Sequence, residues 1–213
     1  MASVEVVSIP NGQFAENCYL LFDPAHPGAV LVDPGEEPEL FLAEARRLGR
    51  TINAIWITHA HLDHISGVGS IQEETGAPIH LHPDDRLLYD NLPQQGLRFG
   101  LRLSAPPAPE VALRHGQRLR LGDAEFEVRH APGHSPGHVC FAGPDVVLGG
   151  DVLFEGSIGR TDLPGGDFQT LIASIRRELL TLPDSTVVHP GHGPATTIRR
   201  ERRSNPFLTG AMV

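Results

Sequence analysis

The stretch Thr58–His64, T-H-A-H-L-D-H, most constrains how this chain can fold. It directly follows the apolar run Ala54–Ile57, which predicts a buried strand. Residues 66–75 come next, and their apolar spacing predicts a helix that ends at Gly76. Three imidazoles and a carboxylate therefore lie on one strand-to-helix turn. Neutral imidazole nitrogen and carboxylate oxygen are ligands that suit zinc, manganese and iron.

Four donors in so short a loop exceed what one tetrahedral ion can take once ligands from elsewhere arrive. We therefore expect His59 and His61 to face one ion, and Asp63 and His64 to face a second. A lone loop histidine is more often a solvated side chain. Of the 12 histidines, however, eight lie in three short stretches, and the later two are rich in Gly and Pro and so predicted to be loops. These stretches are 59–64, 130–138 and 189–192.

The charge balance argues against a nucleic-acid partner. Lys and Arg number 17 against 26 Asp and Glu, a formal net charge of −9, whereas phosphate binding needs a basic surface. The two cysteines, Cys18 and Cys140, do not make a disulfide framework, and we expect both to be reduced core residues. Met1–Pro10 lacks a basic region followed by an apolar stretch, and no run approaches the length of a membrane span. We therefore expect a cytoplasmic protein with no membrane partner.

The order of predicted elements favours one layered α/β domain over residues 1–213. Strands are predicted at 4–9, 17–22, 29–32, 54–57, 78–81, 111–113, 118–121, 124–129, 139–142, 146–148 and 186–189. Helices are predicted at 38–48, 66–75, 83–91, 168–182, where Asp167 can cap the start, and 195–203. The Pro-rich stretch 92–109 predicts a long irregular loop, either near the site or a plain insertion. Two sheets with helices outside would bury every apolar stripe.

Three further loops carry metal donors, and each follows a predicted strand. They are His130–His138, Gly149–Asp151 and His189–Gly193. Glycines in these loops let the backbone bend sharply beside the donors. At this point His134 and His138, and likewise His189 and His192, all qualify as ligands by composition.

The combination of T-H-A-H-L-D-H, G-H-S-P-G-H, G-G-D and P-G-H-G resembles the metallo-β-lactamase fold superfamily over nearly the whole chain. The resemblance implies a four-layer αββα sandwich with two divalent ions at one edge of the sheets. It implies that the first ion is held by His59, His61 and His134. It also implies that Asp63, His64 and His192 hold the second ion, and that Asp151 bridges the two.

Some neighbouring residues have other expected roles. The motif match makes His138 a residue that supports the ligands or packs structurally, and makes His189 the end of a core strand. Asp33 resembles a buried Asp of the superfamily that braces the metal loop, although it also suits the start of a turn before Pro34. We expect no function for His26, His80, His82 and His115.

Two ions that share Asp151 could also share a water, which would become hydroxide near neutral pH and attack a carbonyl. Asp63 and Asp151 are therefore the expected catalytic carboxylates, and the metal is expected to be zinc, with iron or manganese as alternatives. The segment Gly150–Gly166 resembles the short members of the glyoxalase II branch, the hydroxyacylglutathione hydrolases. The aspartate at the bridging position disfavours a β-lactamase, because many β-lactamases of the superfamily use cysteine there.

The resemblance predicts a small-molecule thioester substrate, such as one based on glutathione. Full-length glyoxalase II enzymes carry a further C-terminal helical domain that contacts glutathione, and this chain ends soon after His192, so we expect a high KM and tolerance of other thiol carriers. Arg160 is a candidate contact for an anionic substrate, or else part of a surface ion pair. Gly159–Asp162, G-R-T-D, also resembles iron-dependent persulfide dioxygenases of the same superfamily, the alternative function. A metal-binding module without catalysis is a third.

Overall fold

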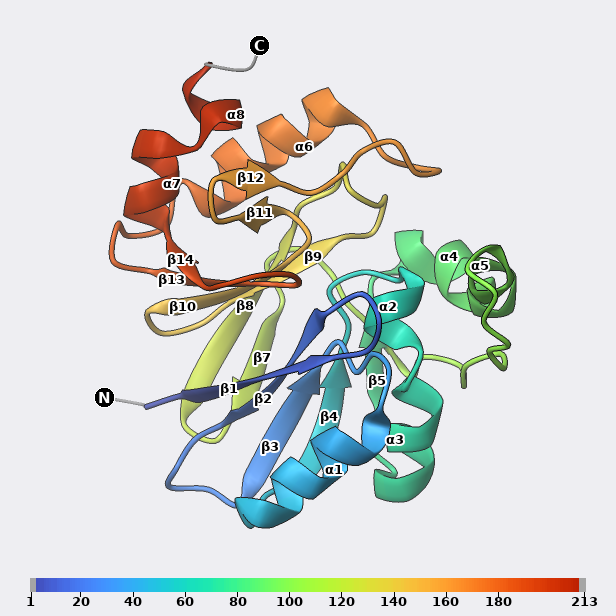
Figure 1. The fold of residues 1–213 in the computed structure, drawn as a ribbon. Coiled ribbons are helices and arrows are strands. Elements are labelled where there is room, and N and C mark those ends of the chain that lie inside the picture. The colour runs from blue at the N-terminus through green and yellow to red at the C-terminus, as the bar shows by residue number, and fades with distance from the viewer. Residues whose placement is uncertain (1–2, 211–213) are drawn as a thin grey trace.

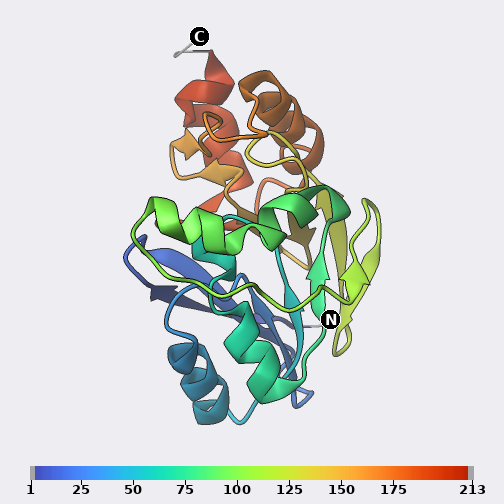
Figure 2. The ribbon, with the colours of Figure 1, turned by 90° about the vertical axis from the view of Figure 1, so that its right-hand side faces the viewer.

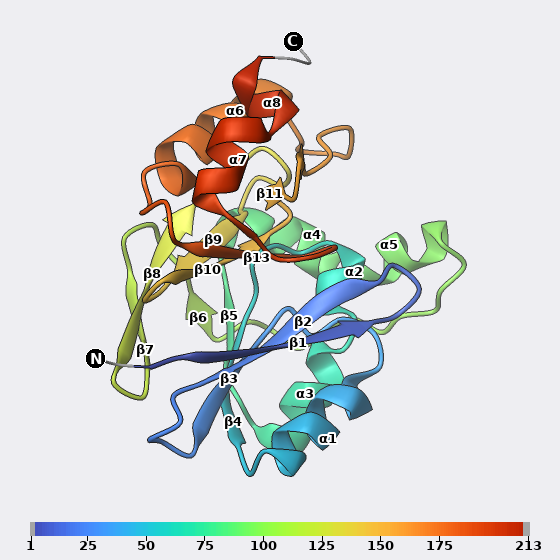
Figure 3. The same ribbon diagram turned by 60° about the vertical axis from the view of Figure 1, so that its left-hand side comes forward.

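The computed structural model of this protein describes residues 3–210. Two six-stranded sheets face each other, and helices cover the outer face of each (Figure 1). Figure 3 shows α1 (Pro38–Arg47) and α3 (Val68–Thr75) at one end of this stack, with α6 (Phe168–Ser174) and α7 (Ile198–Ser204) at the other. The architecture is therefore the αββα sandwich that the sequence predicts.

The first sheet comes from the first half of the chain, with its strands side by side in chain order. They are β1 (Glu5–Asn11), β2 (Glu16–Phe22), β3 (Gly28–Val32), β4 (Thr51–Trp56), β5 (Ile79–Leu81) and β6 (Val111–Ala112). The strands from β1 to β3 are antiparallel, whereas those from β3 to β6 run parallel. The carboxyl ends of β3, β4 and β5 consequently meet at one edge of the sheet.

The second sheet has the order β14-β13-β10-β9-β8-β7. Its strands are β7 (Arg118–Leu121), β8 (Ala124–His130), β9 (Val139–Ala142), β10 (Val146–Gly150), β13 (Val187–Pro190) and β14 (Thr196–Thr197). The pair β10 and β13 is parallel, and the other neighbours are antiparallel. Parallel pairing brings Gly150 opposite Pro190, so the loops after these two strands begin side by side.

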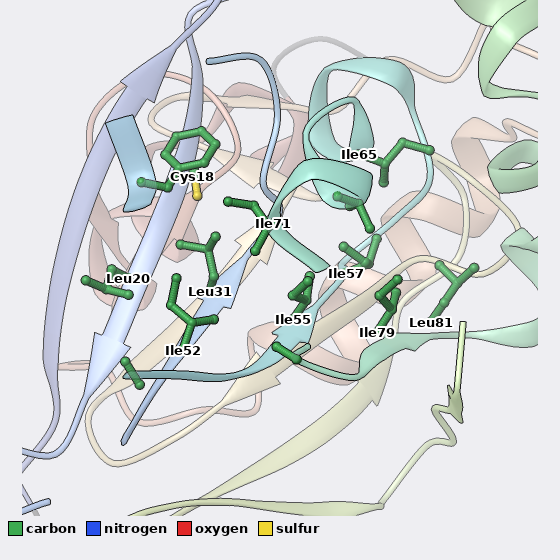
Figure 4. Packing of buried hydrophobic residues seen from close by; sticks show 14 of the residues in the cluster. Cys18, Leu20, Leu31, Ile52, Ile55, Ile57, Ile65, Ile71, Ile79 and Leu81 are labelled. Carbon is green, nitrogen blue, oxygen red and sulfur yellow. The ribbon is translucent and has the colours of Figure 1, made fainter. Parts of the chain in front are cut away.

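The central strands are buried on both faces, which explains their continuous apolar sequences. In β2, Cys18 and Leu20 face the helices of the first half, and Tyr19 and Leu21 face the second sheet, because successive side chains of a strand alternate. Figure 4 shows the outer cluster, in which Leu20 and its neighbours pack with residues of α3. Each fully buried Leu or Ile stabilises the fold by roughly 1.5–3 kcal/mol.

A third cluster lies between the second sheet and the C-terminal helices. Cys140 belongs to it, Cys18 belongs to the outer cluster of the first half, and both are buried thiols, as predicted. Burial raises the pKa of each thiol above its ordinary value. Neither cysteine is therefore suited to nucleophilic chemistry at neutral pH.

The helix expected over 66–75 is confirmed as α3, which ends before Gly76. The sequence did not predict the short α2 (Leu62–Ile65) before it, so Asp63 and His64 lie on a helical turn rather than in a loop. The helix expected over 168–182 is α6 followed by a π-helical turn, η2 (Ile175–Leu179). The predicted cap is confirmed, since the Asp167 carboxylate accepts a hydrogen bond from the backbone N–H of Thr170.

The prediction of an irregular loop over 92–109 was also wrong in its first part, where α5 (Leu92–Arg98) forms. Pro93 lies in the first turn of this helix, a position that has no intrahelical hydrogen bond to lose. In the chain, α5 comes after η1 (Pro83–Asp85) and α4 (Arg86–Asp90). Figure 2 shows α4 and α5 in green, running across the molecule between the N-terminal and C-terminal layers.

The sequence did not predict the small hairpin of β11 (Leu153–Phe154) and β12 (Ser157–Ile158). The helix expected at 195–203 is preceded by β14 and begins only at Ile198, where the Thr197 side chain accepts a hydrogen bond from the Arg200 N–H. A short α8 (Pro206–Thr209) follows it. Within residues 3–210, none of the helices has the length and apolar character needed to cross a membrane.

Candidate metal centre

Every predicted donor lies just beyond the carboxyl end of a strand. The stretch 59–64 follows β4, His134 lies in the loop after β8, and Asp151 directly follows β10. His192 lies two residues beyond β13, beside Asp151 because β10 and β13 run parallel. The facing sheets thus bring residues from both halves of the chain to one place.

Three imidazoles meet closely, and we call them the three-histidine group: His59, His61 and His134. The Nε2 atom of His134 lies 3.1 Å from Nε2 of His59 and 2.8 Å from Nδ1 of His61. All three rings are nearly inaccessible to solvent. Their nitrogens lie close enough to act as ligands of a single ion.

The outer contacts of these rings show which nitrogens carry protons. Nδ1 of His134 donates to the carbonyl oxygen of Arg160 at 2.8 Å, so its Nε2 has a lone pair. The Thr58 hydroxyl donates to Asp33 and therefore accepts from Nδ1 of His59, so Nε2 of His59 also has a lone pair. Two lone pairs that face each other at 3.1 Å cannot form a hydrogen bond. A cation between them satisfies both nitrogens, so the residues present fit a divalent metal.

The second cluster, which we call the mixed group, consists of Asp63, His64 and His192. Nε2 of His192 lies 3.1 Å from Oδ2 of Asp63, and Nε2 of His64 lies 3.8 Å from the same oxygen. Each imidazole again turns its other nitrogen outward, because Nδ1 of His192 donates to the Phe14 carbonyl and Nδ1 of His64 contacts Asp33.

The Asp151 carboxylate lies between the two groups. Its Oδ2 is 3.6 Å from Nε2 of both His134 and His192, and its Oδ1 is 3.5 Å from Nε2 of His64. Oδ1 of Asp151 and Nε2 of His64 are buried without a hydrogen-bond partner in the described chain. Buried polar atoms are rarely left unpaired, so these two atoms also fit a bound cation.

A glycine makes this close approach possible. A Cβ atom at residue 191 would collide with Oδ1 of Asp151 and would lie 2.6 Å from the His64 ring. The sequence P-G-H-G therefore supplies a donor at His192 and, just before it, the space that the Asp151 carboxylate occupies.

The two groups hold protons differently in the metal-free protein. Burial, and then the neighbouring His134, lower the pKa of His61 to about 3. Burial and the nearby His64 also lower the pKa of His59. Burial alone would lower the pKa of His64 as well, but Asp63 and Asp151 outweigh it and raise that pKa well above its ordinary value.

The carboxylates respond in the opposite direction. Burial would raise the pKa of Asp151, yet the neighbouring His64, followed by His134 and His192, lowers it. The pKa of Asp63 is lowered for the same reason, with burial again outweighed by His64 and His192. Both carboxylates therefore stay ionised at neutral pH and can bind cations.

Asp33 supports the loop that carries four donors. Its Oδ1 accepts a hydrogen bond from the Thr58 N–H at 2.7 Å, and its Oδ2 lies 3.0 Å from Nδ1 of His64. The side chain is buried, and the backbone has a φ of 51°. Asp33 thus makes the bracing contacts expected from the resemblance, in addition to preceding a turn.

Sequence reasoning missed Asp85, a buried carboxylate that connects the two loops of the three-histidine group. It accepts hydrogen bonds from the N–H of Ala60, the hydroxyl of Ser135 and the N–H of Gly137, at 2.9, 2.8 and 2.6 Å. Ala60 lies between His59 and His61, and Ser135 directly follows His134. Asp85 therefore sets the distance between the ligands of the two loops.

Gln95 of α5 was missed as well. Its amide nitrogen donates to the carbonyl of Ala60, and its amide oxygen accepts from the N–H of Leu62. Only Leu92 and Gly96 of α5 are buried, so the sequence shows no clear apolar stripe that could have signalled this helix.

The remaining predicted residues have other surroundings. His138 lies behind the centre, where its Nε2 accepts from the Asp151 N–H at 3.0 Å and its ring stacks on that of His59. His189 packs against Tyr19. The exposed Arg160 side chain pairs with Asp162 at 2.7 Å, the surface ion pair that the sequence left as an alternative, while its backbone carbonyl holds His134.

A further histidine cluster contains His82, Asp84 and His130. The rings of His82 and His130 stack in parallel, 4.2 Å apart at an angle of 9°. Lone pairs lie in the plane of an imidazole, so two parallel rings do not aim at one point. This arrangement does not suit a metal ion without rotation of a ring.

A pocket of about 820 Å³ opens over the two groups. Its floor contains His61, Asp63, His134, Asp151 and His192. One wall comes from α4 and α5, and the facing wall comes from β11, β12 and the loop after them. A small molecule in this pocket would reach both groups of donors.

Comparison with known proteins agrees with this geometry. A family model described as the metallo-beta-lactamase superfamily matches residues 11–192. The chain is 41% identical over 204 residues to the hydroxyacylglutathione hydrolase GloC of Haemophilus influenzae. The alignment covers 94% of this chain and 96% of that protein.

Solved structures show the same fold. A di-iron-bound form of TTHA1623 has 46% identity and a TM-score of 0.88, with 95% of this chain and all of that chain covered. The BLEG-1 B3 metallo-beta-lactamase has 39% identity and a TM-score of 0.91, with coverage of 97% and 100%. ETHE1 from Myxococcus xanthus has 31% identity and a TM-score of 0.82, with coverage of 97% and 85%. The chain belongs to the metallo-β-lactamase superfamily, as a metal-dependent hydrolase.

Proposed function

We propose that this protein is a glyoxalase II-like thioesterase that hydrolyses thioesters of the S-2-hydroxyacylglutathione type. The observation that carries the proposal is the position of Asp151 between two groups of metal donors, at the floor of a pocket large enough for such a substrate. The similarity to the protein named hydroxyacylglutathione hydrolase supports the choice of substrate.

In this proposal, the three-histidine group would hold one ion and the mixed group a second, with Asp151 placed to contact both. Zinc is the expected metal, with iron or manganese as alternatives. Divalent ions in such a site lower the pKa of water to about 7 and stabilise negative charge on a carbonyl oxygen. Asp63 and Asp151, both ionised, accept hydrogen bonds from the attacking water and so orient it.

The acidic and basic side chains that line the pocket favour thioesters over amides as substrates. A thiol has a pKa of about 8.5, so a thiolate can leave without a proton donor. An amide nitrogen must be protonated as it leaves. The titratable residues that line the pocket are the donors themselves and two arginines, Arg98 and Arg160, and a guanidinium is too weak an acid to protonate a leaving amine.

The test uses protein purified without added metal. We expect release of thiol from S-lactoylglutathione, and we expect His134→Gln to lose both activity and metal. His189→Gln is the matched control, because His189 lies in the same site region but packs against Tyr19. A metal-loaded wild-type protein that cleaves no thioester would refute the proposal. A β-lactam, suggested by the likeness to BLEG-1, should react far more slowly because it is an amide.

The second candidate is iron-dependent persulfide dioxygenation. Gly159–Asp162 supports it, since the carbonyl of Arg160 within this segment holds His134, and so does the likeness to ETHE1. That reaction would use one iron, held by His59, His134 and Asp151. Oxygen uptake with glutathione persulfide, together with one iron per chain and no thioester cleavage, would favour it over the hydrolase.

A further inference from the structure

We propose that the preferred substrates of this site are thioesters with a large apolar acyl group, such as an aromatic or branched aliphatic 2-hydroxyacyl group. This inference rests on the proposed thioesterase function and specifies its substrate class. The structure supports it through the composition of the two pocket walls and through the exposure of one of them.

The wall formed by α4 and α5 presents apolar side chains to solvent. Leu87 is 75% exposed and Phe99 is 51% exposed, and both line the pocket. The Phe99 ring contacts that of Phe14 edge to face, with centroids 5.2 Å apart, and extends this wall to the turn between β1 and β2. Large apolar side chains so exposed beside a metal centre favour an apolar ligand that covers them.

The facing wall is apolar as well. Phe154 and Ile158 come from the small hairpin, and Leu163 comes from the loop that follows it. A group held between the walls would lose water from both of its sides. Such burial yields about 25 cal/mol per Å² of apolar surface.

The chemistry of biological thioesters decides which part lies between these walls. Thiol carriers are rich in amides and charged groups along their length, so the apolar part of a thioester is its acyl group. The pocket of about 820 Å³ is at the large end of the range for small-molecule sites, and a two-carbon hydroxyacyl group would leave most of the walls uncovered. Arg98 is exposed and lines the pocket, so it can contact the anionic carrier.

The test is a series of glutathione thioesters that share a 2-hydroxyacyl carbonyl and differ in side chain, from lactoyl through branched aliphatic groups to mandeloyl. We expect kcat/KM to rise by about fourfold for each added methylene that the walls bury, the factor that corresponds to ~0.8 kcal/mol. Leu87→Ser and Phe99→Ser should flatten this dependence, with the largest loss of kcat/KM for the bulkiest acyl groups.

Leu97→Ser is the matched control. Leu97 lies on α5, two residues before Phe99, and is 67% exposed, but it does not line the pocket. Its variant should keep the full dependence on acyl size. All three substitutions affect exposed side chains, so folding should be preserved.

The outcomes separate the two proposals. Thioester cleavage that does not depend on acyl size would overturn this inference and leave the proposed function intact. A dependence that persists in Leu87→Ser and Phe99→Ser would also overturn it, because other residues would then select the acyl group. Failure to cleave any thioester would remove the proposed function and this inference with it.

Discussion

The three-histidine group and the mixed group share Asp151 and the floor of one pocket, yet they hold protons in opposite ways. Burial among other imidazoles keeps His59 and His61 neutral, whereas two carboxylates keep His64 protonated in the metal-free protein. The first group therefore offers lone pairs that are ready for a cation. In the second, a proton occupies the position of the metal and must leave when the metal binds.

The substitution with the largest expected effect weakens metal binding in both groups at once. Asp151→Asn removes the charge between them, and we expect kcat/KM for thioesters to fall by about 10³-fold or more. Metal analysis after dialysis should show loss from both groups. Asp162→Asn, which changes an exposed carboxylate, is the control. Two retained metals with full activity would show that the groups work without a shared carboxylate.

The substitution with the next largest expected effect should weaken metal binding only in the three-histidine group. Asp85→Asn replaces one acceptor oxygen with a donor and so removes at least one of the three hydrogen bonds that connect its loops. We expect a 10- to 100-fold loss of metal affinity and about 1–3 kcal/mol of unfolding free energy. Metal titration in a His192→Ala background, where this group is intact, measures the effect directly. Equal affinity with and without Asp85 would make it a purely structural residue.

Asp33→Asn tests the mixed group in the same way, because Asp33 contacts His64 of that group. We expect metal retention there to fall by about 10- to 100-fold. The background is now His134→Ala, which leaves the mixed group complete. Unchanged metal content after dialysis against a chelator would show that Asp33 serves only the turn.

The smallest expected effect concerns the pH dependence of folding in the metal-free protein. The folded pKa of His61, about 3, lies below the unfolded value of about 6.5. Its contribution to stability is therefore complete above pH 6.5 and is lost as the pH falls towards 3, by about 1.4 kcal/mol per pH unit. His64, with a raised pKa, acts with the opposite sign, so its contribution is lost as the pH rises through its folded pKa.

Urea unfolding of wild type and His61→Gln, both free of metal, isolates the contribution of His61 to the pH dependence of stability. The stability advantage of wild type over the variant should decrease between pH 6.5 and pH 5. A difference that does not change with pH would mean that the three-histidine group accepts protons in the folded state, which would remove the contrast between the two groups.

The layered fold and the position of the donors could be predicted because both follow from local patterns. Apolar runs gave the strands, and imidazoles or carboxylates just after them marked one edge of the sheets. The choice between His134 and His138 did not follow from spacing alone. It depends on how the loop after β8 folds back, so that His134 faces His59 while His138 contacts the Asp151 N–H.

Other parts of the site depend on contacts that the sequence does not encode locally. Asp84 and Asp85 are neighbours of the same type, yet Asp84 is exposed and Asp85 is buried, because a loop some 50 residues later supplies two of its hydrogen-bond donors. The helix α5 was missed because prolines dominated the local pattern, although Pro93 is compatible with a first turn. Both errors concern the segment between β5 and β6, which carries Asp85 and α5.

The donors come from both halves of the chain, and this has a consequence for the lifetime of the molecule. An ion bound between the halves stabilises only the folded state, so each tenfold rise in free metal above the dissociation constant adds about 1.4 kcal/mol to the free energy of unfolding. Chains made under metal starvation should open more often and be degraded faster. The abundance of this protein should then follow the metal supply of its cell, even when its synthesis rate is constant.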